Sequence, residues 1–302
     1  MKYNNSLLSF STFILLFFTC CSNDKPVDYS SVEPPQGMVL IPAQVENKKE
    51  ALPAFFMDAT EVTNADFKKF VDATSYVTVA ERPVDWDLLA KELPPGTPKW
   101  PDSMLAAGAL VFTPTDQPVP LHDVSQWWTW TVGANWKHPE GPESTINDIM
   151  DHPVVQIAWE DAVEYAKWAK KRLPTQAEWE WAAQGGVEGA IYPWGDQSID
   201  DESPKANYWQ GLFPYQNREK DGFYGTAPVG SFAANAYGLF DMAGNVWEWC
   251  VEWASPGQRL IKGGSFLCND DYCSGYRTDV DMASTPDTGL NHTGFRCVKD
   301  LE

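Results

Sequence analysis

Basic residues are scarce in this 302-residue chain. Lys and Arg together number 22 against 42 Asp and Glu, which gives a formal net charge of −20. A nucleic-acid-binding surface needs cations to neutralise phosphates, so this balance argues against nucleic acid as a partner. An acidic surface favours solubility, and it is also compatible with hard cations such as Ca²⁺.

Long apolar runs and histidine motifs are also missing. The apolar stretch from Leu7 to Phe18 is shorter than the roughly 20 residues that a membrane-spanning helix needs. The four histidines lack metal-ligand spacing such as His-X-X-X-His, and neither a nucleophile elbow nor a phosphate-binding glycine loop is present. We therefore expect the histidines to be hydrogen-bonded structural residues.

The N-terminal stretch is typical of an export signal, because Lys2 precedes it and two cysteines, Cys20 and Cys21, follow it directly. A cysteine in this place resembles a bacterial lipoprotein cleavage site. We predict a lipoprotein signal peptide over 1–21, lipidation at Cys21 (Cys20 is the alternative), and a flexible tether over 22–36. The protein would then be exported, with a lipid anchor holding it at a periplasmic or outer-membrane location. An ordinary signal peptide with incidental cysteines is the competing hypothesis.

Tryptophan and proline are abundant, at 15 and 23 residues. This composition favours loops fixed by indole packing over a regular bundle or barrel. Residues 82–120 hold eight prolines, and such a long irregular stretch is typical of a packed functional surface. We predict one α+β domain over 37–300 with little regular secondary structure.

Two short apolar segments predict strands. Residues 37–42 form a candidate first strand that ends at a proline, and residues 154–159 form a second one. Apolar residues at helical spacing then predict a helix near 160–171.

Two further helices are indicated by their capping residues. Thr63 is a good N-cap for a helix that continues to about Ala73. Thr175 and Glu178 form a capping box at the start of another helix, which Gly185 ends.

Two of the four remaining cysteines stand close together. Cys268 and Cys273 are five residues apart in a segment that begins Gly263-Gly264-Ser265. Two thiols at this reach can form a disulfide, can hold a soft monovalent metal such as Cu(I), or can be inert. Four cysteines allow three pairings, and spacing alone does not choose among them.

An ordered series of motifs covers nearly everything from Gly37 to Cys297. In chain order the blocks are 61–64 (EVTN), 133–142 (GANWKHPEGP), 152–155 (HPVV), 171–180 (KRLPTQAEWE), 207–211 (NYWQG) with 225–230 (GTAPVG), 237–249 (YGLFDMAGNVWEW), 263–273 (GGSFLCNDDYC) and 294–297 (GFRC). This series resembles the formylglycine-generating enzyme (sulfatase-modifying factor) family. The resemblance implies a bacterial lipoprotein member with the family's compact fold, which is related to C-type lectins.

The resemblance also implies an activity. The family's enzymes use O₂ and Cu(I) to oxidise a cysteine in a sulfatase's Cys-X-Pro-X-Arg segment to formylglycine, so a sulfatase-type protein or peptide is the implied substrate. Cys268 and Cys273 match the copper ligands, and soft thiolates suit Cu(I) while leaving room for a substrate thiolate. Ser265 matches the serine beside the metal, although it can equally be a turn serine. Trp247 matches the indole that lines the substrate groove and Tyr272 neighbours the second cysteine, with core packing as the alternative for both.

Two structural Ca²⁺ sites are implied by the same resemblance. The first consists of Asn207, the Tyr208 carbonyl, Asp221 and the Phe223 carbonyl; the second consists of Asp241, the Gly244 and Val246 carbonyls and Glu248. Mixed carboxylate, amide and carbonyl oxygens are ligands that this hard cation accepts. Ordinary turn acids are the alternative. We expect the protein to be a monomer.

The chain departs from the family pattern in two ways. Ala166, Ala183 and Thr278 stand where vertebrate members carry disulfide cysteines, which leaves Cys297 without its usual partner and Cys250 as a substitute. Asp281 stands where the enzymes usually have arginine, and this exchange predicts acids left without a cation. The alternative function is therefore a non-catalytic lipoprotein that binds or scaffolds other proteins of the cell envelope.

Overall fold

The computed structural model describes residues 29, 31–44, 51–91, 93–199, 203–301. The predicted signal peptide over 1–21, with Cys21, lies outside these ranges, as do residues 22–28 and 30 of the predicted tether. None of the helices within the described ranges has the length and apolar character needed to span a bilayer.

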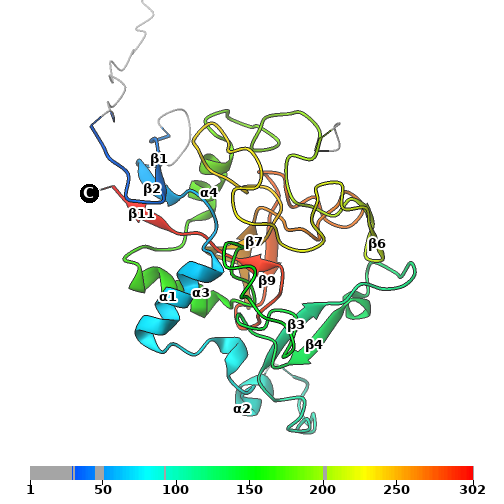
Figure 1. Ribbon diagram of the computed structural model, residues 1–302. Helices are drawn as coiled ribbons and strands as arrows, with labels where there is room; N and C mark the ends of the chain where they lie inside the picture. Colours follow the sequence, from blue (N-terminus) through cyan, green and yellow to red (C-terminus); the bar gives the residue numbers. More distant parts are fainter. Residues whose placement is uncertain (1–28, 30, 45–50, 92, 200–202, 302) are drawn as a thin grey trace, which may run out of the picture. The chain divides into compact units, whose positions relative to one another are not determined.

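The predicted first strand is confirmed, and it belongs to a three-stranded antiparallel sheet. Strand β2 (Phe55–Asp58) is central and fully buried, and it pairs with β1 (Met38–Ile41) on one side and β11 (Val298–Asp300) on the other. The last of the described strands therefore lies beside β2, near the beginning of the domain (Figure 1). This pairing joins segments far apart in the sequence.

A four-stranded sheet carries the cysteine segment. Its centre is the hairpin of β7 (Trp247–Ser255) and β8 (Gln258–Lys262). Strand β10 (Thr293–Gly294) joins β7 in parallel, and β9 (Met282–Ser284) joins β8 antiparallel. The Gly-Gly-Ser turn leaves the end of β8, so this sheet fixes where the cysteines begin.

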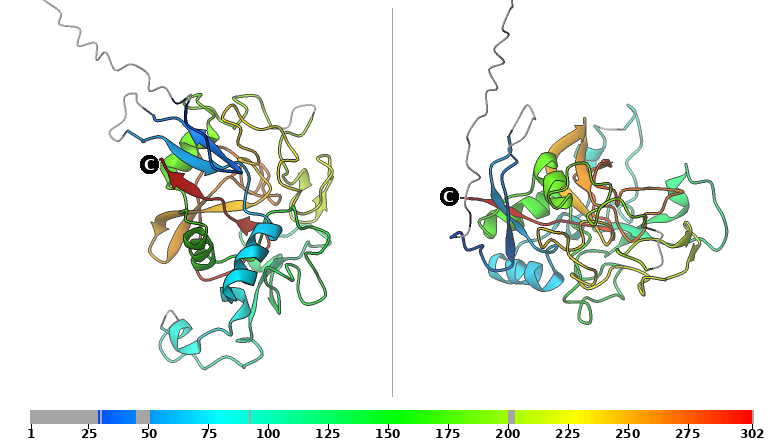
Figure 2. Two further views of the ribbon diagram at one scale, coloured as in Figure 1. Left: turned by 60° about the vertical axis from the view of Figure 1, so that its left-hand side comes forward. Right: turned by 90° about the horizontal axis from the view of Figure 1, so that it is seen from above.

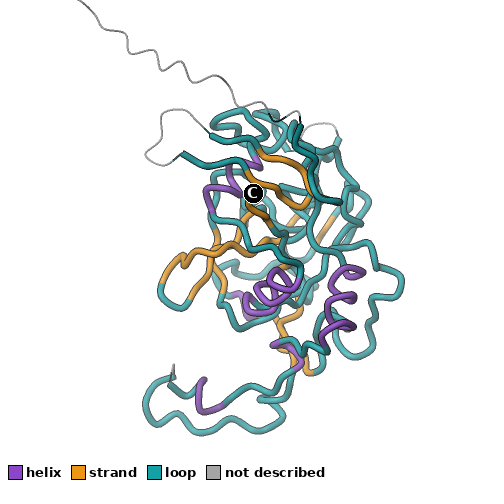
Figure 3. The backbone as a smooth tube through the Cα atoms, turned by 90° about the vertical axis from the view of Figure 1, so that its left-hand side faces the viewer, coloured by secondary structure: helices purple, strands orange, loops and turns teal. Residues whose placement is uncertain are grey.

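Two smaller antiparallel pairs complete the sheets. They are β3 (Gly108–Phe112) with β4 (Trp128–Val132) and β5 (Gly211–Leu212) with β6 (Gln216–Asn217). Short helical turns connect other parts: η1 (Val79–Glu81), α2 (Trp86–Leu89) and η2 (Val124–Gln126). Most of the remaining backbone is loop, as predicted (Figure 3).

The capped helices are confirmed. Helix α1 (Asn64–Thr74) begins after Thr63, whose hydroxyl accepts a hydrogen bond from the Asp66 amide. Helix α4 (Gln176–Ala183) has the predicted capping box, because the Thr175 amide donates to Glu178 and the Glu178 amide donates to Thr175.

The structure places α3 at Trp159–Trp168, in agreement with the helix predicted nearby. The strand predicted over 154–159 is wrong. Gln156 adopts a left-handed conformation with φ 61°, which interrupts the extended backbone that a strand needs. The Gln156 amide instead donates to the Leu290 carbonyl and its side chain donates to the Pro139 carbonyl, so the segment connects two loops.

Aromatic side chains hold the helices and loops together. The Phe67 ring lies edge-on to Phe70 and Trp136 and stacks on Tyr165. In this way α1 packs beside α3. Figure 2 shows α1 in light blue and α3 in green. Trp136 and Trp209 are almost fully buried although both lie in loops, which is the indole packing that the composition predicts.

Candidate active site

The Gly263–Gly264 turn directs the chain from β8 into the cysteine segment. Both glycines have positive φ, at 93° and 75°. A Cβ atom on Gly264 would lie 2.6 Å from the Tyr276 backbone nitrogen, so only glycine fits this close approach. The turn therefore depends on a backbone conformation that a residue with a side chain could adopt at position 264 only with strain.

Cys268 and Cys273 form a disulfide, with their Cα atoms 5.0 Å apart. Asn269 holds the intervening loop in shape: its carbonyl accepts from the Cys273 amide at 2.8 Å, and its side chain accepts from the Tyr272 amide at 2.9 Å. The disulfide alternative is thus the state that the structure contains. The loop is fixed by these hydrogen bonds as well as by the disulfide.

The predicted sulfur-site residues all line one cavity of about 160 Å³. They are Trp247, Ser265, Cys268, Tyr272 and Cys273. Among the described residues, no Lys, Arg, Asp or Glu lines this cavity, whose other walls are mainly aromatic and aliphatic. A thiol that enters this cavity would therefore lose its contact with water. It would lie among apolar side chains and the two cysteine sulfur atoms.

Two of these residues have structural roles as well. The Ser265 hydroxyl is buried and accepts a hydrogen bond from the Leu267 amide at 3.2 Å, as a turn serine does. The Trp247 indole packs against the backbone at Gly275, where an added Cβ would lie 2.1 Å from the ring. Both side chains therefore make contacts within the protein and also line the cavity.

Aromatic stacking fixes the wall nearest to the second cysteine. The Tyr272 ring stacks on Phe213 with centroids 4.4 Å apart, and it lies edge-on to Trp127 at 5.5 Å. Burial raises the pKa of the Tyr272 phenol. This residue therefore stays a neutral hydroxyl at physiological pH.

His292 also lines the cavity, and the sequence alone did not identify it as a site residue. Its ring lies 4.8 Å from Trp128, and its carbonyl accepts from the Trp247 amide. Burial lowers the pKa of His292 to about 3, so the imidazole is neutral. A single histidine outside any ligand motif carries no sequence signal, because its place depends on the pairing of β10 with β7.

Of the residues predicted for the first Ca²⁺ site, Tyr208 and Asp221 lie together and the Phe223 amide donates to Asp221, whereas the Asn207 side chain donates to the Gly225 carbonyl and to Asn245. The side-chain amide of Gln210 donates to the Tyr208 carbonyl at 2.7 Å and to the Asp221 carboxylate at 2.5 Å. No cationic side chain pairs with Asp221 in the described part of the chain, and burial raises its pKa. A carboxylate and a carbonyl that share one donor are compatible with a hard cation.

Residues of the second predicted Ca²⁺ site lie in a buried acidic cluster. Asp241 accepts from the Gly230 amide at 2.6 Å. Both oxygens of Glu248 are engaged, because Arg296 donates to each at 2.7 Å and Trp179 donates to one at 2.8 Å. The structure adds a third acid, Glu61, which the sequence indicated only as part of a motif.

Glu61 is the unbalanced member of this cluster. One of its carboxylate oxygens accepts from Asn245, whereas the other is buried with no hydrogen-bond partner. Burial and the neighbouring Asp241 raise the pKa of Glu61 well above its ordinary value. One arginine therefore faces three buried acids, and the raised pKa of Glu61 favours a proton on this carboxyl, a place that a cation could take instead.

Side chains alone do not form either of the two candidate Ca²⁺ sites. Within the described ranges, no group of three or more His, Cys, Asp or Glu side chains is arranged to hold a metal ion. Both candidates thus depend on the backbone carbonyls and amides that the family resemblance adds to the acids.

Two predictions about unpaired groups are wrong. Asp281 is not left without a cation, because Lys262, which is fully buried, donates to it at 2.8 Å and also to Glu180 at 3.0 Å. Cys250 and Cys297 do not pair: both are free and buried. Burial raises the pKa of both thiols, so they behave as small apolar residues.

Comparison with known proteins agrees with this fold. Residues 29–301 match the family model described as a sulfatase-modifying factor enzyme 1-like domain. The formylglycine-generating enzyme of Mycobacterium tuberculosis is 46% identical over 272 residues, covering 82% of this chain and 88% of that protein. The inactive C-alpha-formylglycine-generating enzyme 2 of Bos taurus is 37% identical, covering 80% and 76%. Among solved structures, PvdO from Pseudomonas aeruginosa has a TM-score of 0.54 at 19% identity, covering 87% and 94%, and shares the fold.

The α+β fold thus defines a class of protein whose members include proteins named as enzymes and one named as inactive. The chain belongs to the formylglycine-generating enzyme (sulfatase-modifying factor) family.

Proposed function

We propose that this protein oxidises a cysteine in a Cys-X-Pro-X-Arg segment of a sulfatase-type protein to formylglycine. The observation that carries the proposal is the convergence of Cys268 and Cys273 in a cavity with Ser265, Trp247 and Tyr272. The similarity to an enzyme named for this reaction supports it.

The reaction replaces the carbon–sulfur bond of the client cysteine with a carbon–oxygen double bond. One O₂ and two further electrons with two protons balance the products, which are the aldehyde, hydrogen sulfide and water. The client CH₂–SH carbon is oxidised and O₂ is reduced. An external thiol can supply the two electrons, and it would also open the Cys268–Cys273 disulfide.

The two cysteines would hold Cu(I) as thiolates, and the donor set fits because two sulfurs meet in a cavity that no charged side chain of the described residues lines. When bound, copper would supply the one-electron chemistry that reaction with O₂ requires. The chain's own residues would enclose the client thiol: Trp247 and Tyr272 form apolar walls, and Ser265 offers a fixed hydroxyl. Because His292 is neutral, it does not add a positive charge to the cavity that could bind the client thiolate in place of copper.

The direct test is incubation of the reduced, copper-loaded domain with a Cys-X-Pro-X-Arg peptide, O₂ and a thiol reductant. Mass spectrometry should show the aldehyde peptide, and Cys268→Ser and Cys273→Ser should each abolish it. A Cys250→Ser variant is the matched control, because that thiol is buried away from the cavity and should retain activity. Absence of product with the unaltered domain would refute the proposal.

A non-catalytic envelope role is the second candidate. Two observations favour it: the cysteines are joined as a disulfide, and one relative is named as inactive. A stable complex with an envelope protein that survives substitution of both Cys268 and Cys273, together with no peptide conversion, would establish this role instead.

We further propose that the mature protein is exported and anchored by lipid at Cys21, as a monomer. The motif that supports this is the apolar stretch followed by Cys20-Cys21. Labelling with a fatty-acid analogue should be lost in Cys21→Ser and retained in Cys20→Ser. The reverse pattern would move the anchor to Cys20.

A further inference from the structure

The cysteine cavity contains a third sulfur atom, which the proposed function does not use. Met282 of β9 lines the same cavity of about 160 Å³ as Cys268 and Cys273. The Met282 side chain is 39% exposed, whereas Cys268 is only 1% exposed. Met282 therefore lies nearer to solvent than the first cysteine does.

Strand pairing turns Met282 toward the cavity. Strand β9 is at the edge of the four-stranded sheet, and Met282 is the register partner of Ile261 in β8. Directly opposed residues of an antiparallel pair project from the same face, with Cβ atoms about 5 Å apart. Ile261 lines the cavity and is buried in the cluster that contains Trp247 and Cys268. Met282 thus covers this cluster from the edge strand.

Few other side chains of the cavity suit a soft metal ion. His292 lines the cavity, but no group of three or more His, Cys, Asp or Glu side chains in the described ranges is arranged to hold a metal ion. This imidazole therefore does not complete a site with the two cysteines. A thioether sulfur is a soft ligand that favours Cu(I) over hard cations. Met282 is thus the remaining soft donor among the described walls.

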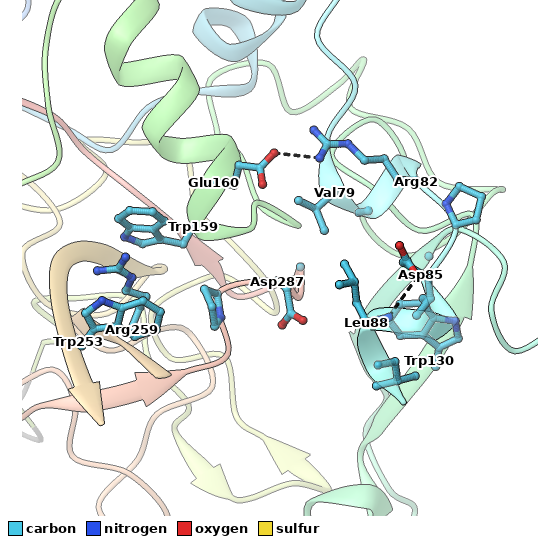
Figure 4. A pocket seen from close by; sticks show the side chains of 17 residues that line it. Val79, Arg82, Asp85, Leu88, Trp130, Trp159, Glu160, Trp253, Arg259 and Asp287 are labelled. Atoms are coloured by element: carbon cyan, nitrogen blue, oxygen red, sulfur yellow. Dashed lines mark hydrogen bonds and ion pairs between the residues drawn. The ribbon is translucent and has the colours of Figure 1, made fainter. Parts of the chain in front are cut away.

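The larger groove, of about 570 Å³, lacks this chemistry (Figure 4). None of the described residues that line it is a Cys, Met or His. Its arginines are engaged within the protein, because Arg82 pairs with Glu160 at 2.9 Å. The Arg259 guanidinium lies 3.7 Å from the ring centroids of both Trp159 and Trp253. A soft ion would find no sulfur or imidazole ligand in this groove.

A thioether differs from a thiol in the way it binds an ion. It carries no proton and is uncharged, whereas a cysteine thiol must release its proton and bind as a thiolate. A neutral thioether can therefore bind first and then lose the ion to two thiolates. The methionine side chain has three rotatable bonds, so its sulfur can turn without movement of the backbone. These properties suit a ligand that acts while an ion enters.

We propose that Met282 is the entry ligand of the copper site: in the reduced protein its thioether binds Cu(I) on the solvent side of the cavity and transfers the ion to Cys268 and Cys273. The transfer is a ligand exchange without a change of oxidation state. The bond from the thioether breaks, two thiolate bonds form, and the two thiol protons go to solvent. This assignment rests on the proposed function, because it takes Cu(I) and its cysteine ligands from it.

Uptake kinetics test the assignment. Cu(I) is offered to the reduced protein without O₂ as its coloured bathocuproine disulfonate complex, and the loss of colour reports the uptake. Met282→Leu conserves the side-chain volume and should slow the uptake roughly fivefold. The equilibrium affinity should not change, because the thiolates hold the ion in the end. Met104→Leu is the matched control, since Met104 is 53% exposed but does not line the cavity.

The methionine methyl resonances report a direct contact. Ag(I) is a diamagnetic soft substitute for Cu(I), and it should shift the signal of Met282 and leave that of Met104 unchanged. When Cys268→Ser and Cys273→Ser are combined, the Met282 signal should still shift, at a higher Ag(I) concentration, because the thioether then binds alone.

Three results would overturn the assignment. They are an unchanged uptake rate in Met282→Leu, a Met282 methyl signal that does not respond to Ag(I), and a loss of equilibrium affinity as large as the loss of rate. The third result would make Met282 a permanent ligand of the site.

Failure of the proposed function gives a different pattern. Uptake that depends on Met282, without conversion of any peptide, upholds the assignment and refutes the oxidase. Conversion of the peptide by a protein whose uptake does not depend on Met282 overturns only the assignment.

Discussion

Lys262 Nζ lies 2.8 Å from the Asp281 carboxylate, in the segment that follows the cysteine loop. The lysine is fully buried and also donates to Glu180 and to the Val280 carbonyl. The acid at 281, which departs from the family pattern, therefore completes a local charge network.

Removing the charge at 281 should be tolerated, whereas reversing it should not. Asp281→Asn keeps one acceptor for Lys262 and should lower the free energy of unfolding by about 1 kcal/mol. Asp281→Arg places a second cation beside a buried one and should cost about 3 kcal/mol. Urea unfolding at physiological salt measures both, and equal effects would show that the pair has no role in stability.

Gly264 should be irreplaceable in the turn that leads to the cysteines. Gly264→Ala adds a clash with the Tyr276 backbone to the strain of positive φ, and should cost several kcal/mol or prevent folding. Gly257→Ala is the matched control, because Gly257 has φ 78° but nothing within 4 Å of an added Cβ. It should cost only about 1 kcal/mol. A similar loss for both, measured by thermal unfolding, would contradict the packing argument.

Calcium should stabilise the protein through the acidic cluster at Glu61. At a concentration of 100 times Kd, a ligand of the folded state adds about 2.7 kcal/mol to the free energy of unfolding. Glu61→Gln should reduce this gain, and it should leave the calcium-free domain about as stable as the unaltered one, because the raised pKa of Glu61 already favours a neutral carboxyl there. Thermal unfolding with calcium and with a chelator measures both. A calcium gain that is undiminished in Glu61→Gln would exclude this residue from the site.

Asp161 should make stability depend on pH. Burial raises its pKa from 3.8 to about 6. The folded state then binds more protons than the unfolded state between these values, so stability should fall as pH rises from about 4 to about 6, by at most about 1.4 kcal/mol per pH unit. In Asp161→Asn this slope should become flatter, and in the control Asp148→Asn it should not. An unchanged slope in Asp161→Asn would show that other groups cause the pH dependence.

Local features of the fold could be predicted from the sequence because they depend on neighbouring residues. The caps at Thr63 and at Thr175 with Glu178 involve hydrogen bonds across three positions. The false strand prediction over 154–159 arose because nothing in the sequence shows the left-handed conformation of Gln156.

The part of the site that lies within one continuous segment could be predicted from the sequence. Residues that come from distant segments were missed. The cysteine loop is continuous, so spacing indicated that its sulfurs could converge. Glu61 contacts Asn245 across 184 positions, and the His292 ring contacts Trp128, which is also far from it in the sequence. Such contacts depend on the tertiary fold, which composition and periodicity do not specify.

Copper stoichiometry of the reduced domain tests the account most directly. The two cysteines should together bind one Cu(I) per chain, and Cys268→Ser and Cys273→Ser should each abolish tight binding while Cys250→Ser retains it. Tight Cu(I) binding that persists after both Cys268 and Cys273 are replaced, or its absence from the unaltered reduced domain, would contradict the proposed sulfur site.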